Sequence, residues 1–327
     1  MIFSLPSTTS RDISKALVSI RDTGSQVMTG RVLTLIIVAS TEDNTTELIE
    51  LATDATREHP ARVLMVLPDE SEEDGNLDAE IRIGGDAGAS EIVVMRVRGE
   101  LASHVDSLVT PLLLPDTPIV AWWPSQAPEI PAEDPIGQIA QRRITDSFFD
   151  PRDDAIFARR SSYAPGDSDL AWSRLTTWRG VVASALDRPP YHEIVGVEIT
   201  GPQESPSVEL AGGWLADRLG LKAMRHSEAF ARLASPVFKL VLHRKDADPV
   251  VIEAVDRRTM RVSVPGSADA LVAASRRSIA DCLAEELRHL DPDRAYGQAL
   301  RGLSRVHPAE SSADNAGATA ESTSGTD

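Results

Sequence analysis

The stretch Val32-Leu33-Thr34-Leu35-Ile36-Ile37-Val38-Ala39 is apolar at every position except Thr34. It lacks the polar alternation of a half-exposed strand, so it predicts a strand that is covered on both faces, as in α/β sheets. Apolar residues with helical spacing follow over 48–55, and residues 61–67 predict a second buried strand. This order predicts a βαβ unit with a right-handed crossover and a parallel sheet.

Further elements around this unit predict a first α/β domain over residues 1–163. Residues 79–83 alternate strictly between apolar and polar, and residues 91–97 do so less strictly, which predicts two half-exposed strands. A final apolar strand is expected at 119–122, followed by a proline-rich surface excursion over 124–135. We expect this domain to be Rossmann-like, with a largely parallel sheet.

A second α/β domain is predicted for residues 164–307. One continuous helix is expected over 171–186, because apolar residues recur there every three or four positions. Short connections join three later strands, which predicts an antiparallel meander within a mixed sheet with flanking helices. Residues 308–327 are poor in apolar side chains and predict a disordered acidic tail. The predicted fold class is therefore α/β, with two mixed α/β domains.

The composition of the 327 residues predicts a cytoplasmic protein. Cys282 is the single cysteine, which excludes an intramolecular disulfide and fits a reducing compartment. No signal peptide is expected at the start of the sequence, and no apolar run is long enough to cross a membrane. The formal net charge of −17 disfavours nucleic acid and anionic membrane surfaces as partners.

The sequence has no convergent cluster of reactive side chains, so we predict no catalytic residues, no metal site and no cofactor. The histidines lack the spacing of a metal-binding helix face. Cys282 lies beside the apolar stripe of a predicted helix, which favours a core thiol over a nucleophile. Gly84, Gly85 and Gly88 form a weak candidate for an anion-binding turn, but a tight connection between strands is favoured because Asp86 would repel phosphate.

Trp122, Trp123, Arg142, Arg143 and Asp146 are the candidate residues for a partner interface. Adjacent side chains of a strand point to opposite faces, so one indole can be exposed while the other is buried. Exposed tryptophan with arginine is typical of interface hot spots. Two alternatives remain open: both rings can pack beneath the proline-rich segment, and the arginines can form intramolecular ion pairs.

Several stretches in both predicted domains, between about residues 10 and 303, together resemble one protein family. They are GRVLTL at 30–35, REHPARV at 57–63, IGGDAGASE at 83–91, PLLLPD at 111–116, VAWWP at 120–124, QRRITD at 141–146 and SIADCLAEEL at 278–287. The family is that of the OpcA-type glucose-6-phosphate dehydrogenase assembly proteins of actinobacteria and cyanobacteria.

The resemblance implies a non-catalytic assembly factor or allosteric activator. Such a protein binds glucose-6-phosphate dehydrogenase, promotes its active oligomer and supports the oxidative pentose phosphate pathway and its supply of NADPH. Cyanobacterial members are linked to thiol control of the dehydrogenase, whereas Cys282 has no internal partner here. The alternatives are a sugar-phosphate- or nucleotide-binding α/β enzyme, using the glycine turn and the strand ends near Trp122, or a metabolite sensor that acts on a partner.

Overall fold

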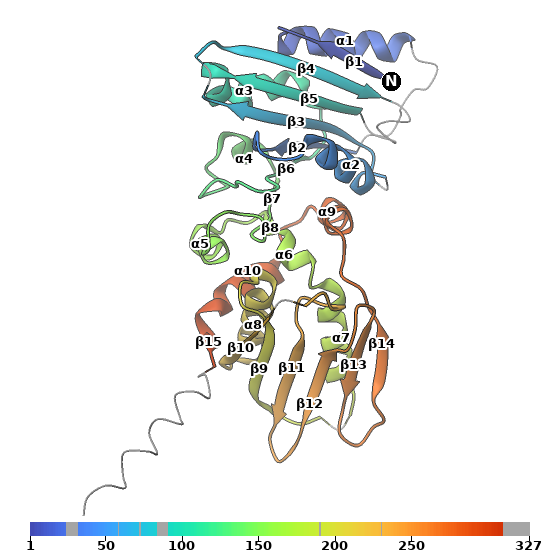
Figure 1. The fold of residues 1–327 in the computed structure, drawn as a ribbon, viewed down its shortest axis with the longest axis vertical. Helices are drawn as coiled ribbons and strands as arrows, with labels where there is room; N and C mark the ends of the chain where they lie inside the picture. The colour runs from blue at the N-terminus through green and yellow to red at the C-terminus, as the bar shows by residue number, and fades with distance from the viewer. Residues whose placement is uncertain are drawn as a thin grey trace, which may run out of the picture. The chain divides into compact units, whose positions relative to one another are not determined.

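The computed structural model describes residues 1–23, 32–57, 59–71, 73–83, 91–189, 191–229 and 231–309. The chain forms two compact units (Figure 1). The first contains Met1–Thr177 and Arg276–Leu300, and the second contains Trp178–Ser275 and the chain from Arg301. One sheet has eight strands and the other has seven, each with helices, which confirms the predicted class of two mixed α/β domains.

The sheet of the first unit has the strand order β1-β4-β5-β3-β2-β6-β7-β8. Neighbouring strands from β5 to β8 are parallel, whereas the pairs β4·β5 and β1·β4 are antiparallel. The sheet is therefore largely parallel, with an antiparallel edge. Its strands are β1 (Ile2–Leu5), β2 (Leu33–Val38), β3 (Ala61–Asp69), β4 (Asn76–Ile83), β5 (Glu91–Arg98), β6 (Ile119–Trp122), β7 (Arg142–Thr145) and β8 (Asp167–Asp169).

The predicted βαβ unit is present as β2, α2 (Thr45–Ala55) and β3, with β2 and β3 parallel. Asn44 begins the helix, because its side chain accepts hydrogen bonds from the backbone N–H groups of Thr46 and Glu47. Both strands are buried along most of their length. Their unbroken apolar runs follow from burial on both faces.

Helices cover both faces of this sheet. On one face, α2 and α9 (Ile279–Arg288) pack in a core that contains Trp122. On the other face, α1 (Ser10–Thr23), η2 (Gly99–His104), α3 (Val105–Val109), η3 (Thr110–Leu112) and α4 (Pro135–Ile139) pack in a core that contains Trp123. The two adjacent indoles thus enter opposite core layers, as the alternation of side chains along a strand requires.

Three sequence-based predictions are wrong. Strand β5 is not half-exposed, because its residues from Glu91 to Met95 and Val97 are buried. The sheet does not end at β6, because β7 and β8 add two further parallel strands whose side chains are buried although many are polar. The helix expected over 171–186 is broken into α6 (Leu170–Ser173) and α7 (Thr176–Leu186). The break lies at Arg174, whose guanidinium group pairs with Asp146 in the region of the candidate site.

The sheet of the second unit has the strand order β14-β13-β12-β11-β9-β10-β15. Strands β11 to β13 form an antiparallel meander, as predicted, and β14 extends it by a fourth strand that the sequence did not predict. Strands β9, β10 and β15 are parallel. Helix α8 (Pro206–Leu219) packs on β9 and β10 and ends at Gly220, whose φ of 69° is left-handed. The strands are β9 (Ile194–Pro202), β10 (Ala223–Glu228), β11 (Lys239–Arg244), β12 (Ala247–Ala254), β13 (Thr259–Ser263), β14 (Ala270–Ala273) and β15 (Val306–Pro308).

The observed units differ from the predicted boundary at residue 163 in two respects: residues 164–177, which include β8 and α6, and helix α9 both belong to the first unit. Leu283 and Leu287 of this helix belong to the same core as α2 and the first sheet. An amphipathic stripe shows that a helix covers something apolar, but it does not show which sheet the helix covers.

Helix α10 (Arg294–Gly302) and η4 (Leu303–Arg305) follow α9. The predicted acidic tail lies outside the described residues from 310 onward. None of the described helices is both long and apolar enough to span a membrane.

Candidate functional site

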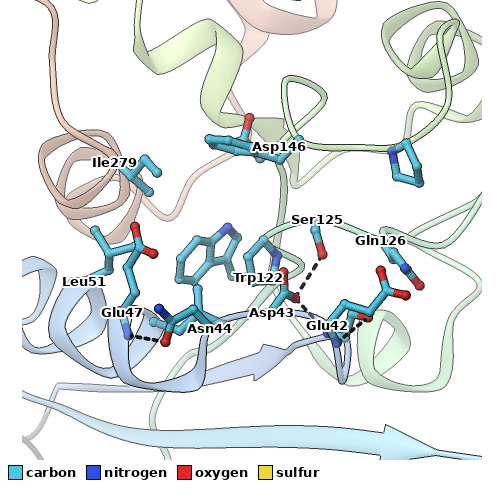
Figure 2. A pocket seen from close by; sticks show the side chains of 15 residues that line it. Glu42, Asp43, Asn44, Glu47, Leu51, Trp122, Ser125, Gln126, Asp146 and Ile279 are labelled. Carbon is cyan, nitrogen blue, oxygen red and sulfur yellow. Dashed lines mark hydrogen bonds between the residues drawn. The ribbon is translucent and has the colours of Figure 1, made fainter.

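A pocket of about 400 Å³ opens at the carboxyl ends of β2 and β6 in the first unit (Figure 2). It is lined by the loop after β2, the first turns of α2, the segment after β6, the residues after β7 and Ile279 of α9. In the strand order, β3 lies on one side of β2 and β6 on the other. The chain order reverses at this point, which is where open α/β sheets form a ligand-binding crevice.

Hydrogen bonds to Asp43 connect the two loops that border the pocket. Its carboxylate accepts a hydrogen bond of 2.8 Å from the backbone N–H of Ser40 and one of 2.9 Å from the Ser125 hydroxyl. Ser40 follows β2 and Ser125 follows β6, so this one side chain holds the ends of two neighbouring strands together (Figure 2). We infer that the shape of the pocket is preorganised at this border.

The charged side chains that line the pocket are all acidic. Glu42, Asp43, Glu47 and Asp146 contribute carboxylates, and neither lysine, arginine nor histidine is among the described lining residues. Carboxylates repel phosphate, which outweighs the favourable field of the amino end of α2. The pocket is therefore suited to a neutral or cationic group and poorly suited to an anion.

Asp146, at the inner side of the pocket, is neutralised by Arg174. The two side chains form a bidentate ion pair with both N–O distances at 2.7 Å, and Asp146 is 1% exposed. The guanidinium group also lies over the rings of Phe148 and Phe149, at 5.4 and 5.9 Å from their centroids. This arrangement fixes the segment that follows β7.

A second buried carboxylate, Asp169, lies behind this ion pair. It accepts hydrogen bonds from the hydroxyl groups of Thr145 and Ser147 at 2.7 and 2.6 Å, and from the Ala171 backbone N–H at 2.8 Å. Burial raises the pKa of Asp169 to about 6, and the neighbouring carboxylate of Asp146 contributes to this rise. Asp169 has hydrogen-bonding roles at the end of β8 and at the start of α6, which identifies it as a structural group.

The structure decides between the alternatives for the Trp122-Trp123 pair: both indoles are buried, in opposite core layers and not together beneath the proline-rich segment. Trp122 is 1% exposed and Trp123 is 2% exposed, because both faces of the sheet are covered by helices. Trp122 lines the pocket, whereas Trp123 belongs to the opposite core. The Nε1 group of Trp122 is buried and has no hydrogen-bond acceptor among the described residues.

The two candidate arginines form intramolecular ion pairs, which was the alternative to clamping a partner. Arg142 donates to the Glu286 carboxylate and, at 2.8 Å, to the Asp291 carbonyl. Arg143 pairs with Asp167 and donates to the carbonyl of Ala140 at 3.0 Å. Both side chains are buried, so they do not form an exposed docking surface together with the tryptophans.

The remaining sequence candidates do not add to the site. Gly84, Gly85 and Gly88 lie outside the described residues. Cys282 is buried in the core between α9 and the sheet, and burial raises its pKa to about 12, as expected for an unreactive core thiol. Within the described part of the chain, no group of three or more His, Cys, Asp or Glu side chains is arranged to hold a metal ion.

Several pocket residues were not identified from the sequence. Asp43 and Asn44 lie in the loop after β2, and Glu47 lies in the first turn of α2. The polar run that directly follows a buried strand was a signal that could have located them. Arg174 and Asp169 had no such signal. Their roles depend on β7 and β8, which the sequence pattern did not reveal.

Two family models match the chain in succession. Residues 52–162 match the N-terminal domain of a glucose-6-phosphate dehydrogenase subunit, and residues 165–300 match the C-terminal domain of the same subunit. The chain belongs to the OpcA family. The resemblance seen in the sequence is thereby confirmed, and the matches of OpcA-family models extend over most of the described chain.

A curated relative and a solved structure were also found. The relative is the putative OxPP cycle protein OpcA of Synechocystis sp., which is 30% identical over 141 residues. That match covers 39% of this chain and 29% of the relative, so the aligned part is less than a third of the relative's length. The solved structure is KijD10, a 3-ketoreductase from Actinomadura kijaniata, with 9% identity and a TM-score of 0.43 over 84% of this chain and 98% of the other. A likeness this distant does not bear on the chemistry of this OpcA-family chain.

Proposed function

We propose that this chain is a non-catalytic assembly factor that binds glucose-6-phosphate dehydrogenase in the cytoplasm and promotes its active oligomer. The observation that carries the proposal is that two consecutive family models, both of a glucose-6-phosphate dehydrogenase subunit, match residues 52–162 and 165–300. An activator of this kind binds the active form of its partner more tightly than the inactive form. A differential affinity of ~1–3 kcal/mol is usual for such coupling.

The charge of the pocket supports this role over that of an enzyme acting on sugar phosphates or nucleotides. Such an enzyme needs cationic side chains or exposed backbone N–H groups around the phosphate. The described lining residues offer four carboxylates and no cationic side chain. The pocket therefore favours a binding function that does not involve a phosphate group.

The overall charge supports association with a basic surface. The chain has a formal net charge of −17, and such a field accelerates encounters with a positively charged partner while it repels nucleic acid. Because this steering is screened by salt, we expect the complex with the dehydrogenase to weaken as ionic strength rises.

Titration of the purified chain into glucose-6-phosphate dehydrogenase tests the proposal. We expect both the activity and the sedimentation coefficient of the dehydrogenase to change at micromolar concentrations of the chain, and an unrelated dehydrogenase to be unaffected. If neither quantity changes, the proposal is wrong. In parallel, sugar phosphates and nucleotides should leave the melting temperature of the isolated chain unchanged, since a ligand that binds the native state would raise it.

A further inference from the structure

The pocket at the ends of β2 and β6 has two carboxylates that are available to a ligand. Asp43 is held by Ser40 and Ser125, and Asp146 is paired with Arg174. Glu42 and Glu47 are exposed, and the part of the chain that the structure describes offers neither of them a cationic partner. A cation entering here would meet two free negative charges.

The same pocket has a polar group that needs an acceptor. The side chain of Trp122 is 1% exposed, and its Nε1–H is without an acceptor in the described structure. Figure 2 shows the indole of Trp122 below Asp146, with its nitrogen on the side of the ring that faces Asp146. A buried donor that lacks a hydrogen bond costs about 1–3 kcal/mol, so a ligand that supplies an acceptor is favoured over one that does not.

We propose that this pocket receives an arginine or lysine side chain of the partner protein, and that a backbone carbonyl of the same segment accepts from Trp122. The cationic head would be attracted by the negative charges of Glu42 and Glu47, which both line the pocket. A basic residue within a peptide carries both required groups, a cation and a neighbouring carbonyl. The inference rests on the proposed function, because it assigns the contact through which the dehydrogenase is held.

The walls of the pocket suit such a side chain. Phe149 is half-exposed and presents an aromatic ring, and the half-buried Leu51 presents aliphatic surface. Aromatic faces attract ammonium and guanidinium groups, and the aliphatic stem of lysine or arginine packs on apolar surface. A neutral sugar could also hydrogen-bond to the carboxylates, but it would leave the two negative charges uncompensated.

Binding of acetyl-arginine amide to the full chain tests the pocket without the dehydrogenase. Calorimetric titration should detect saturable binding, and acetyl-citrulline amide, which has the same shape without the charge, should bind at least about tenfold more weakly. Glucose and glucose 6-phosphate serve as the sugar probes. Equal binding of the arginine and citrulline probes, or binding of glucose in place of the arginine probe, would overturn the proposal.

A pair of variants tests the position of the site. The double variant Glu42→Gln, Glu47→Gln removes the two free charges of the pocket. Its affinity for acetyl-arginine amide should be about five- to tenfold lower than that of the wild type, since each exposed ion pair contributes modestly. Glu100→Gln with Glu133→Gln removes two charges that do not line the pocket, and it should bind the probe as the wild type does. Equal loss in both double variants would show that only the overall charge matters and would overturn the proposal.

The indole resonance of Trp122 reports the carbonyl contact. In a ¹⁵N-labelled sample, with the resonance assigned by Trp122→Phe, the Nε1–H signal should shift on addition of acetyl-arginine amide. Ethylguanidine has the cation but no carbonyl, so it should shift the signal much less. A Trp122 signal that does not respond to acetyl-arginine amide would contradict the proposed hydrogen bond.

Titration of the same variants into the dehydrogenase separates this inference from the proposed function. If the pocket variant binds the dehydrogenase about tenfold or more weakly than the control variant, and with a shallower dependence on salt, the inference holds. If both variants bind as tightly as the wild type, the pocket is not the contact and the inference fails while the proposed function stands. A wild-type chain that binds the arginine probe but no dehydrogenase overturns the proposed function and the assignment of the dehydrogenase as the partner, while the pocket's preference for a basic side chain stands.

Discussion

In the first sheet, strand β3 is buried from Ala61 to Leu67, and this run includes Arg62. In the second sheet, strand β12 alternates between buried and half-buried positions, and its Glu253 is half-buried. The difference follows from the helices, which cover both faces of the first sheet but leave half-exposed side chains along the strands of the second. Polar side chains of the first sheet therefore need partners inside the protein.

Buried ion pairs meet this requirement in the first unit. Arg62 donates to Glu91 at 2.9 Å, Arg142 pairs with Glu286, and Arg143 pairs with Asp167, all with little exposure. In the second sheet, Arg261 and Glu253 pair at 2.7 Å with side chains 40% and 34% exposed. The comparison predicts that a Glu→Gln substitution in an ion pair lowers the free energy of unfolding much more in the first unit than in the second.

Among the proposed substitutions, Glu286→Gln should lower the free energy of unfolding most. It leaves the buried Arg142 guanidinium group without its carboxylate, and removing one partner of a buried pair costs about 3–5 kcal/mol. The free energy of unfolding can be obtained from the first unit's transition in urea. Glu253→Gln is the matched control and should cost less than about 1 kcal/mol, since exposed pairs contribute little. Equal costs for the two variants would refute the comparison.

The pH dependence of stability should also differ between the units. The pKa of Asp169 is raised from 3.8 to about 6 by burial. The folded protein thus holds this proton more tightly than the unfolded chain. The stabilisation from Asp169 is fully present below pH about 4 and is lost as the pH rises through 6. With these pKa values, the advantage of the wild type over Asp169→Asn should fall by roughly 2 kcal/mol between pH 4 and 7.

The contribution of Asp256, in the exposed connection after β12, should depend on pH in the opposite direction. Hydrogen bonding to the Arg258 backbone N–H lowers the pKa of its carboxyl, so its contribution is present above the unfolded pKa and is lost as the pH falls. Urea unfolding of Asp169→Asn and Asp256→Asn at several pH values, each relative to the wild type, measures both trends. Two curves that slope in the same direction would show that burial is not the cause.

The sequence located the longer elements whose pattern is apolar, although it missed the short strands β1 and β14. It located β2, α2 and β3 from an unbroken apolar run, a helical stripe and a second run, and it located the meander from short connections. It missed β7 and β8, because their buried residues are arginines, threonine, aspartates and serine that look solvent-exposed in isolation. Only their ion-pair partners distant in sequence, such as Glu286 for Arg142, make their burial possible.

Two of the five candidate interface residues, Trp122 and Asp146, line the pocket at the strand ends, whereas Trp123, Arg142 and Arg143 do not. Both indoles are buried, which was one of the alternatives that the sequence left open. A period-two pattern shows that Trp122 and Trp123 point to opposite faces, yet it contains no information on whether both faces are covered. That depends on α9, which returns to the first sheet from near the end of the chain.

In the second unit, the backbone at Gly302 packs closely against that of helix α8, and Gly302→Ala tests how far stability depends on this contact. A Cβ atom at Gly302 would lie 1.9 Å from the carbonyl oxygen of Gly213 in α8, so the backbone must move. We expect Gly302→Ala to lower the free energy of unfolding by about 1–3 kcal/mol, as at other overpacked sites. Gly180→Ala in α7 meets no atom within 4 Å and should be neutral or stabilise by up to about 1 kcal/mol. If urea unfolding shows that Gly302→Ala is as stable as the wild type, the two backbones do not pack this closely.

The smallest effect on stability is expected for Cys282→Ala, at about 1 kcal/mol, because the side chain loses only one buried sulfur atom. The thiol is more useful as a reporter of α9. Burial raises its pKa to about 12, so a disulfide reagent at pH about 8 should label the native protein only through transient opening of this helix. Because Arg142 and Glu286 join α9 to β7, Glu286→Gln should increase the labelling rate, whereas Glu253→Gln should not. Rapid labelling of the wild type would show that α9 separates readily from the first sheet, and that the buried ion pair does not hold it there.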